Sequence, residues 1–375
     1  MGVQLDSNEG NSFPCKVWLA SLYVNTGVLT HPDLELAGVP PATAPAWAGV
    51  LISNFSHFLT VLLLYGLSLR VFGGGQKAGS LALVTAGLHI VSPAGLFLSA
   101  PNAESPFALF HILGMLSYTE SLLCRRNGAV TRSDLWLLLS GASVGMAAAV
   151  RSNGLISGFY FAYGAISAGS QVFQGRISVM QIRQLVVIVI SGILVALGFV
   201  LPQIVAYREY CALNSYEQRP WCSAMPPSIY SFVQEHYWNN GLFRYWTVSN
   251  IPLFALAGPI LAIMIVSSVW ASNFPRVSKT ALEGRRPAVN STALLPIFAV
   301  PQAFIAVYIL TAGHVQIINR LSSGYPVWYW WIAGLMDKSS KPRESGWDAP
   351  KWITRWMVMY ALIQAALYSS FLPPA

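Results

Sequence analysis

The sequence predicts an all-α fold: a polytopic transmembrane helical bundle of about ten spans. Three observations lead to this prediction. Hydrophobic residues make up 54% of the 375 residues and charged residues only 10%, whereas soluble domains carry about 25% charged residues. Apolar runs close to the roughly 20 residues that a spanning helix requires recur along the chain. The basic residues lie in short clusters between these runs, which is typical of topology signals in membrane proteins.

Residues 1–45 precede the first apolar run and are predicted to form an irregular lumenal segment. They lead into the Pro-rich sequence GVPPATAPAW, which breaks regular structure. They contain no basic start followed by an apolar core, so we expect no cleavable signal peptide at this terminus. Residues 46–375 are predicted to form one multi-spanning membrane domain.

Ten apolar runs define the expected helices. In chain order they cover 46–69, 81–100, 106–123, 135–150, 155–169, 185–205, 252–269, 294–311, 325–336 and 356–371. The fourth, fifth and ninth runs are short, and we expect them to be kinked, tilted or re-entrant, because irregular backbone is tolerated at membrane depth where protein shields it. The longest polar insertion is predicted to be a lumenal loop at 206–250.

The basic residues predict the orientation of the bundle. If the chain crosses the bilayer at each run and begins outside the cytoplasm, sixteen of its 22 Lys and Arg residues fall on one side. The six on the other side are Lys16, Arg151, Arg208, Arg219, Arg244 and Arg320. Cytoplasmic loops are enriched in Lys and Arg, so the poorer side is predicted to be lumenal. The net charge of +8 forms no dense patch, and nucleic acid is not expected as a partner.

The lumenal loop 206–250 is rich in aromatic residues, which fit two interpretations. The simpler one is an interfacial aromatic belt. The functional one is an amphipathic segment that lies on the lumenal leaflet and shapes the entry for a lipid-linked substrate. Cys211 and Cys222 in this loop could form a disulfide in an oxidising compartment. The four cysteines show no CxxC pair and no Cys/His ligand spacing, so no metal site is expected.

Glu104 is the candidate general base. It follows Pro101 at the end of the apolar stretch SPAGLFLSAPNAES, in a turn that is predicted to be lumenal. Ionisable groups at the edge of a membrane span are costly, and each is therefore a candidate functional residue. A carboxylate at this boundary can accept a proton as a general base. Alternatively, it stabilises the N-terminus of the next helix. The residues leave both alternatives open.

Further candidates for binding substrate lie in two other lumenal segments. They are Arg151 and Asn153 in VRSNG, and His314, Gln316, Asn319, Arg320 and Tyr325 in GHVQIINRLSSGYPVWYWW. Arginine forks bind phosphate with two hydrogen bonds, so the arginines fit a lipid phosphate leaving group. The alternative is that they only anchor the chain at the interface, as the aromatic run after Gly324 is predicted to do.

Histidines and soluble-enzyme motifs give no second site. His57, His89 and His111 lie inside predicted spans, where hydrogen bonding between helices is the simpler interpretation. The sequence contains no Gly-rich phosphate loop after a strand, no GxSxG elbow between a strand and a helix, and no HExxH; its GxSxG match, GASVG at 141–145, lies inside the predicted run 135–150. This argues against nucleotide-dependent catalysis and the common hydrolase chemistries.

Three segments resemble the GPI mannosyltransferase 2 family of the endoplasmic reticulum. They are LISNFSHFLTVLLLYGLSL, HIVSPAGLFLSAPNAESPFALF and HVQIINRLSSGYPVWYWW, and the similarity runs from about Trp47 to the C-terminus. The resemblance implies a multi-pass enzyme of the GT-C type that transfers the second mannose, in an α-1,6 linkage, to the GPI precursor glycolipid. It implies dolichyl phosphate mannose as the donor substrate, no further cofactor and no metal. A small membrane partner subunit is a further candidate.

The resemblance also assigns residues and leaves one alternative. Glu104 matches the acid of the family's AP-x-x-E turn, while His314, Asn319 and Arg320 match its late lumenal motif. Family members usually open with a span and a lumenal loop that carries a Trp-Asp pair, and residues 1–45 contain no such pair. We therefore expect this chain to lack that first span and loop. The alternative functions are a catalytically inactive truncated homologue and a transporter-like membrane protein.

Overall fold

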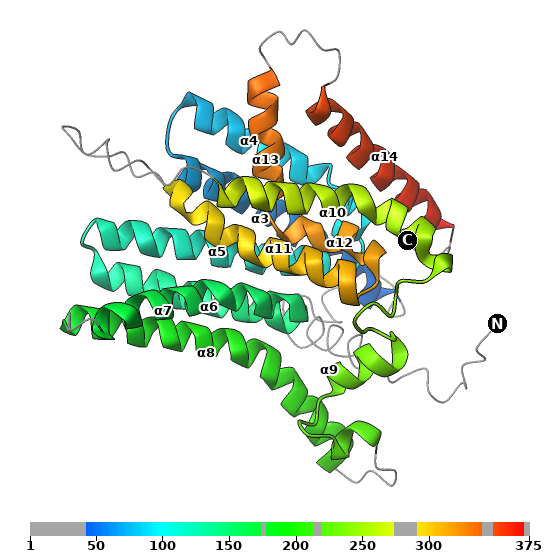
Figure 1. Ribbon diagram of the computed structural model, residues 1–375, viewed down its shortest axis with the longest axis horizontal. Helices are drawn as coiled ribbons and strands as arrows, with labels where there is room; N and C mark the ends of the chain where they lie inside the picture. Colours follow the sequence, from blue (N-terminus) through cyan, green and yellow to red (C-terminus); the bar gives the residue numbers. More distant parts are fainter. Residues whose placement is uncertain (1–42, 174–177, 213–218, 274–290, 340–347, 371–375) are drawn as a thin grey trace.

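The structure is a computed structural model that describes residues 43–173, 178–212, 219–273, 291–339 and 348–370 (Figure 1). Its α-helices are α3 (Ala44–Phe72), α4 (Gln76–Ile90), α5 (Glu104–Arg126), α6 (Val130–Val150), α7 (Phe159–Phe173), α8 (Val179–Tyr207), α9 (Ile229–Phe232), α10 (Ile251–Ser272), α11 (Leu295–Ala312), α12 (Ile318–Leu321), α13 (Val327–Ser339) and α14 (Ala349–Ser369). No strand occurs in these five ranges. The predicted all-α fold is confirmed.

Six of the described helices, α3, α5, α6, α8, α10 and α11, are long and apolar enough to cross a bilayer. Helices α4, α7 and α13 have only 15, 15 and 13 residues. The prediction of a helical membrane bundle is confirmed, whereas the count of about ten spans is not. The fourth predicted run, 135–150, was expected to be short, but it belongs to the 21-residue helix α6, because that helix begins upstream among polar residues at Val130.

The second predicted span, 81–100, is wrong, because α4 ends at Ile90 in the middle of this run. Pro93 has no backbone N–H to continue a helical ladder, and Gly95 has a φ of 46°, in the left-handed region that glycine tolerates best. The residues between α4 and α5 therefore form irregular backbone with one short 3-10 turn, η1 (Gly95–Leu98). This turn packs against α3, α5 and α14, so protein shields its polar backbone.

Helices α5, α6 and α8 form the best-packed part of the bundle. Two serines connect them: Ser140 Oγ donates to the carbonyl oxygen of Gly114 at 2.7 Å, and Ser191 Oγ donates to that of Leu137 at 3.1 Å. Hydrogen bonds of this kind stabilise helix contacts where lipid supplies no hydrophobic driving force. In Figure 1, α7 and α8 lie along α6 at the lower edge of the molecule.

The two ends of the bundle carry different side chains. Helix α5 begins at Glu104, and α6, which runs antiparallel to it, ends beside it at Val150. We call this end, which also carries α9 and α12 at the right of Figure 1, the Glu104 end. The opposite end holds the α5–α6 turn and is called the Arg125 end. By the predicted topology, the Glu104 end is lumenal and the Arg125 end is cytoplasmic.

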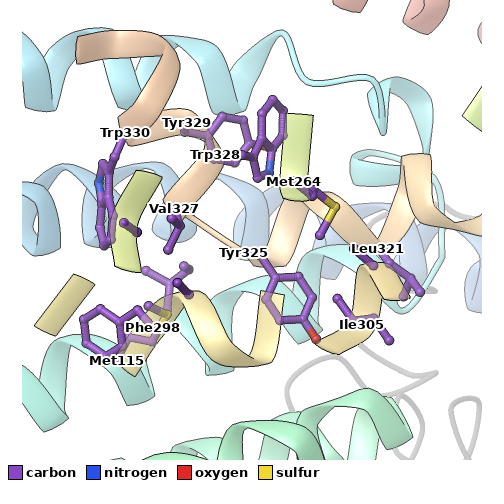
Figure 2. Close-up of a cluster of buried hydrophobic side chains, with 14 of the residues drawn as sticks. Met115, Met264, Phe298, Ile305, Leu321, Tyr325, Val327, Trp328, Tyr329 and Trp330 are labelled. Atoms are coloured by element: carbon purple, nitrogen blue, oxygen red, sulfur yellow. The ribbon is translucent and has the colours of Figure 1, made fainter. Parts of the chain in front are cut away.

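A buried aromatic cluster holds the chain after α12 in the core (Figure 2). Trp328, Tyr329 and Trp330 are each 0% exposed, so the prediction that this aromatic run anchors the chain at the interface is wrong. Trp330 Nε1 donates to Ser68 Oγ at 2.8 Å, and Trp328 Nε1 donates to the carbonyl oxygen of Ser322 at 3.0 Å. Buried Trp side chains need such partners for their N–H groups, and these two fix the segment that follows Arg320.

Candidate active site

Glu104 lies at the start of α5 and is only 1% exposed. One of its two carboxylate oxygens, Oε1, accepts hydrogen bonds from two arginines. Arg151 Nη1 donates to it at 2.7 Å, and Arg320 approaches it with Nε at 2.8 Å and Nη2 at 2.6 Å. Three predicted site residues from distant parts of the sequence therefore meet at one carboxylate.

Neither arginine lies in a long helix. Arg151 follows α6 in an extended conformation, with φ of −145° and ψ of 129°, and Arg320 lies in the four-residue helix α12. The guanidinium of Arg320 stacks over the ring of Phe97, 4.1 Å from its centroid, which restricts the guanidinium plane. The irregular chain between α4 and α5 thus supplies both Phe97 and the start of the helix that carries Glu104.

The cluster of Glu104, Arg151 and Arg320 carries an excess of positive charge. One carboxylate balances one of the two guanidiniums, so one positive charge remains. Each guanidinium has five N–H donors, and Arg151 and Arg320 remain 18% and 23% exposed. The second carboxylate oxygen, Glu104 Oε2, is buried and has no hydrogen-bond partner among the described residues. The cluster therefore has donors available for an anion and an acceptor available for a hydroxyl.

Asn153 and Tyr325, both predicted site residues, are hydrogen-bonded to each other. Asn153 lies in the 3-10 segment η2 (Ser152–Gly158), and its Nδ2 donates to the Tyr325 hydroxyl oxygen at 3.1 Å. Burial raises the pKa of Tyr325 to about 12, so its hydroxyl stays protonated at neutral pH. The pair connects the segment after Arg151 to the segment after Arg320.

His111 makes the same connection. The sequence predicted hydrogen bonding between helices for this residue, and the structure shows which groups it joins. Its Nδ1 lies 2.8 Å from the carbonyl oxygen of Gly324 and its Nε2 lies 2.6 Å from Ser157 Oγ. A carbonyl only accepts, so Nδ1 donates, and in the neutral ring Nε2 accepts the Ser157 hydroxyl. One sequence signal was present: Glu104 and His111 are seven residues apart and therefore share a face of α5.

Close approach of the backbone at Gly324 makes the His111 contact feasible. A Cβ atom at this position would clash with the Phe107 ring of α5. Glycine therefore lets the loop after α12 lie directly against α5.

The remaining predicted site residues of the late lumenal segment, His314, Gln316 and Asn319, precede Arg320 in the chain. His314 Nε2 donates to the carbonyl oxygen of Trp238 at 2.7 Å, and Gln316 Oε1 accepts from the Tyr245 hydroxyl at 2.9 Å. Both residues therefore hold the loop 206–250 and make no described contact with Glu104. Asn319 is 1% exposed, and its Oδ1 has no partner among the described residues.

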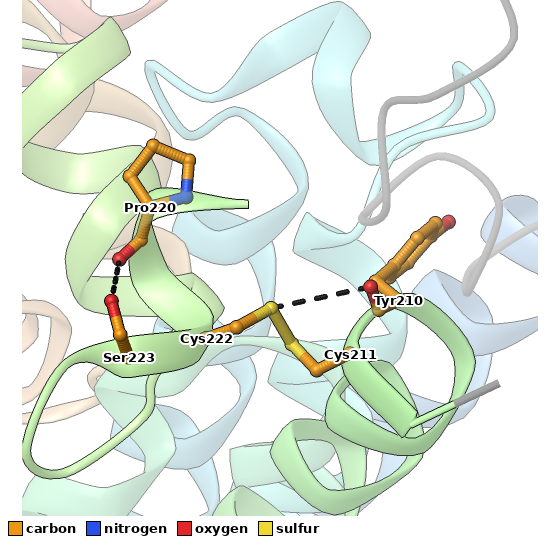
Figure 3. The surroundings of a disulfide bond; sticks show 5 residues. All are labelled: Tyr210, Cys211, Pro220, Cys222 and Ser223. Carbon is orange, nitrogen blue, oxygen red and sulfur yellow. Dashed lines mark hydrogen bonds between the residues drawn. A yellow bond between two sulfur atoms is a disulfide. The ribbon is translucent and has the colours of Figure 1, made fainter. Parts of the chain in front are cut away.

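Cys211 and Cys222 form a disulfide, with their Cα atoms 5.7 Å apart (Figure 3). Trp221 beside it is buried with Ala206 and Ile229 in a small core of its own. The disulfide and this small core give the loop at the Glu104 end a fixed structure next to the end of α8.

Comparison with known proteins decides the family. The family model described as Mannosyltransferase (PIG-V) matches residues 42–375. The chain belongs to this mannosyltransferase family. GPI mannosyltransferase 2 of Aspergillus oryzae is 44% identical over 332 residues, which cover 87% of the chain and 74% of the relative. The protein of the same name from Chaetomium globosum is 40% identical over 369 residues, which cover 93% of the chain and 74% of the relative. No solved structure matches.

Membership of the PIG-V family confirms the predicted resemblance and the predicted glycosyltransferase class. The matched range, 42–375, agrees with the predicted similarity from about Trp47 onward. Residues 1–42 lie outside the described part of this PIG-V family chain, so the expected lack of an opening span and of its Trp-Asp pair stays a prediction. The roles assigned to individual site residues are likewise predictions.

Proposed function

We propose that this chain is a mannosyltransferase of GPI-anchor biosynthesis that adds the second mannose to the GPI precursor glycolipid. The donor is dolichyl phosphate mannose, the new linkage is α-1,6, and the reaction occurs on the lumenal face of the endoplasmic reticulum. The family and the name shared by its relatives support the reaction class. The excess of arginine on the lumenal carboxylate supports the donor, since dolichyl phosphate is an anionic leaving group.

The single observation that carries the proposal is the sharing of Glu104 Oε1 between Arg151 and Arg320. The donor phosphate carries negative charge that grows when the bond from its oxygen to the sugar C1 breaks. Guanidinium forks bind phosphate oxygens bidentately, and such fixed donors stabilise developing charge in a transition state. Because these groups can supply the positive charge, we propose that transfer needs no metal and no cofactor beyond the donor.

Glu104 Oε2 is the atom proposed to receive the acceptor. The acceptor 6-hydroxyl donates to this oxygen and its own oxygen attacks C1 of the mannose, so an O–C1 bond forms on the face opposite the leaving group. The C1–O bond to dolichyl phosphate breaks, and the bonding electron pair leaves with the phosphate. The hydroxyl proton moves to Glu104. The two arginines stabilise the ionised carboxylate and so oppose this transfer, which eases as the leaving phosphate takes over their hydrogen bonds.

The experiment is transfer of labelled mannose from dolichyl phosphate mannose to a one-mannose precursor. It uses membranes of cells that lack the second mannosyltransferase and express this chain. We expect a two-mannose product whose new bond is cleaved by an α-1,6-mannosidase. Full expression without any product in these membranes would favour the inactive homologue, and an added small partner subunit would then be tested in the same assay.

Conservative changes of the arginines connect the activity to the cluster. Arg151→Lys and Arg320→Lys keep the charge but lose the planar fork, so the KM for the donor is expected to rise at least about tenfold, the cost of one charge-assisted hydrogen bond. Arg244→Lys is the matched control, because Arg244 lies at the same end in an exposed pair with Glu235. Parent kinetics in both cluster variants would leave these arginines as interfacial anchors only.

A further inference from the structure

A polar cavity lies at the Arg125 end, at the opposite side of the bundle from Glu104. It has a volume of about 180 Å³ and opens between α5, α7, α8 and the start of α11. Polar side chains that line it come from three of these helices: Ser121 and Arg125 of α5, Tyr163 and Ser167 of α7, and Gln184 of α8. Their position at the predicted cytoplasmic end excludes them from the proposed sugar transfer.

An apolar groove continues from this cavity along α7 and α8. It has a volume of about 280 Å³, and Phe161 and Ile188 line both spaces. Its other walls are small or aliphatic, among them Ala162 and Ala165 of α7 and Gly192 of α8. These short side chains leave room for the groove, whose lining residues belong to the predicted membrane runs 155–169 and 185–205. The polar cavity lies at one end of the groove.

The charges beside the cavity repeat the pattern of the Glu104 end. Asp134, a buried residue near the start of α6, pairs with two arginines: Arg125 Nη2 lies 3.0 Å from its Oδ1 and Arg183 Nε lies 2.6 Å from its Oδ2. Arg125 Nη1 also donates to Gln184 Oε1 at 3.1 Å. One carboxylate again balances one of two guanidiniums, so one positive charge remains beside the cavity.

We propose that this cavity and groove bind one anionic phospholipid of the cytoplasmic leaflet. Its phosphate lies against Arg125 and Arg183 and balances the excess charge, and one acyl chain fills the groove between α7 and α8. A soluble anion would leave the apolar groove empty. A lipid without net charge would leave the excess charge unbalanced. Basic side chains at a cytoplasmic membrane surface attract anionic headgroups, and the groove adds apolar contact that a surface charge alone lacks.

The test measures lipid retention by the purified chain. The chain is exchanged into neutral detergent with equal amounts of dioleoyl phosphatidylserine and dioleoyl phosphatidylcholine, and lipids that remain bound are counted by native mass spectrometry. We expect one phosphatidylserine per chain, in several-fold excess over phosphatidylcholine. Equal retention of the two lipids would overturn the proposal.

Three variants separate the site from diffuse charge. Arg125→Gln is expected to lower phosphatidylserine retention about fivefold, the effect of one basic group near a headgroup. Arg126→Gln is the matched control, because Arg126 is the next residue, is exposed and lines neither space. Gly164→Leu leaves every charge in place but occupies the cavity, since a Cβ there meets Ile188 at 3.5 Å and the Tyr118 hydroxyl at 3.8 Å, which are ordinary contacts. We expect Gly164→Leu to lose the bound lipid.

Two patterns of result contradict the site. Equal losses of bound phosphatidylserine in Arg125→Gln and Arg126→Gln would show that the lipid is attracted only by the basic surface and not by the cavity. Undiminished retention in Gly164→Leu would show that the lipid does not enter the cavity. Melting temperatures of all three variants show whether any loss reflects unfolding.

Discussion

Single residues decide the chemistry at the Glu104 end, and Glu104 itself is the first to test. Glu104→Gln keeps the shape of the side chain but removes its charge and basicity. A general base contributes on the order of a hundredfold or more in rate, so mannose transfer at matched protein level is expected to fall by at least that factor. The amide would also leave Arg151 and Arg320 facing each other without a shared anion, which adds to the loss.

The competing role for Glu104, stabilising the N-terminus of α5, predicts a different result. That role contributes about 1 kcal/mol or less to stability, so turnover of Glu104→Gln would stay near the parent rate. The melting temperature is expected to fall under both roles, because the amide leaves Arg151 and Arg320 without their shared carboxylate. The transfer rate at matched amounts of folded protein therefore separates the two roles. A near-parent rate would move the general base to another acid.

His111 is predicted to position both arginine segments. His111→Phe keeps a ring of similar size but leaves the Gly324 carbonyl and the Ser157 hydroxyl without their partner. Each unpaired buried group costs about 1–3 kcal/mol, so we expect a lower melting temperature and a higher donor KM, with the acceptor KM unchanged. A fall in stability without any change in donor KM would reduce His111 to a packing residue.

At the scale of elements, the sequence predicted helices better than their interruptions. All ten apolar runs contain helices. An apolar run of this length is buried in lipid or protein, where a helix satisfies the backbone hydrogen bonds. The same composition hid the break after Ile90, since Phe97 and Leu98 are apolar and buried although their backbone is a 3-10 turn. Pro93 and Gly95 were the available signals, and they lay inside a run whose length was already sufficient for a span.

Gly95 carries a prediction for this element. Gly95→Ala places a Cβ 2.8 Å from that of Ala361 in α14, at a φ of 46°. The left-handed backbone alone costs about 1–2 kcal/mol for a residue with a Cβ, so the melting temperature should fall by several degrees. Gly79→Ala is the matched control, because Gly79 lies inside α4 with nothing within 4 Å and alanine favours helix there. Equal melting temperatures of the two variants would show that a Cβ at position 95 does not strain the backbone.

For the whole molecule, the sequence predicted which residues share a side of the membrane but not which of them touch. Glu104, Arg151 and Arg320 were assigned to the lumenal side by the alternation of spans, and they meet. His314 and Gln316 were assigned to the same side, yet they hold the loop 206–250 instead. Contacts between segments more than a hundred residues apart depend on helix packing, which one sequence without relatives does not reveal.

The orientation of the whole bundle provides the last prediction. The chain has two glycosylation sequons, Asn54-Phe-Ser56 and Asn290-Ser-Thr292. Asn54 lies within the candidate span of α3, and its Nδ2, the atom that would carry a glycan, donates to the carbonyl oxygens of Val50 and Ser99. Asn290 falls between α10 and α11 on the basic side that is predicted to be cytoplasmic. Neither sequon should carry a glycan.

A positive control makes this topology test decisive. Tyr216→Thr creates the sequon Asn214-Ser-Thr between the bonded cysteines Cys211 and Cys222, on the predicted lumenal side. Expressed in endoplasmic reticulum membranes, this variant should show a mass that falls on glycosidase treatment, while the parent chain should not. A glycan at Asn290 would overturn the predicted topology, because it would place Asn290 on the lumenal side, but it would not by itself exclude the proposed enzyme. Because the membrane bilayer sorts charges by side over the whole chain, the sixteen-to-six distribution of basic residues that the predicted alternation of runs gives favours a sequon at Asn290 without a glycan.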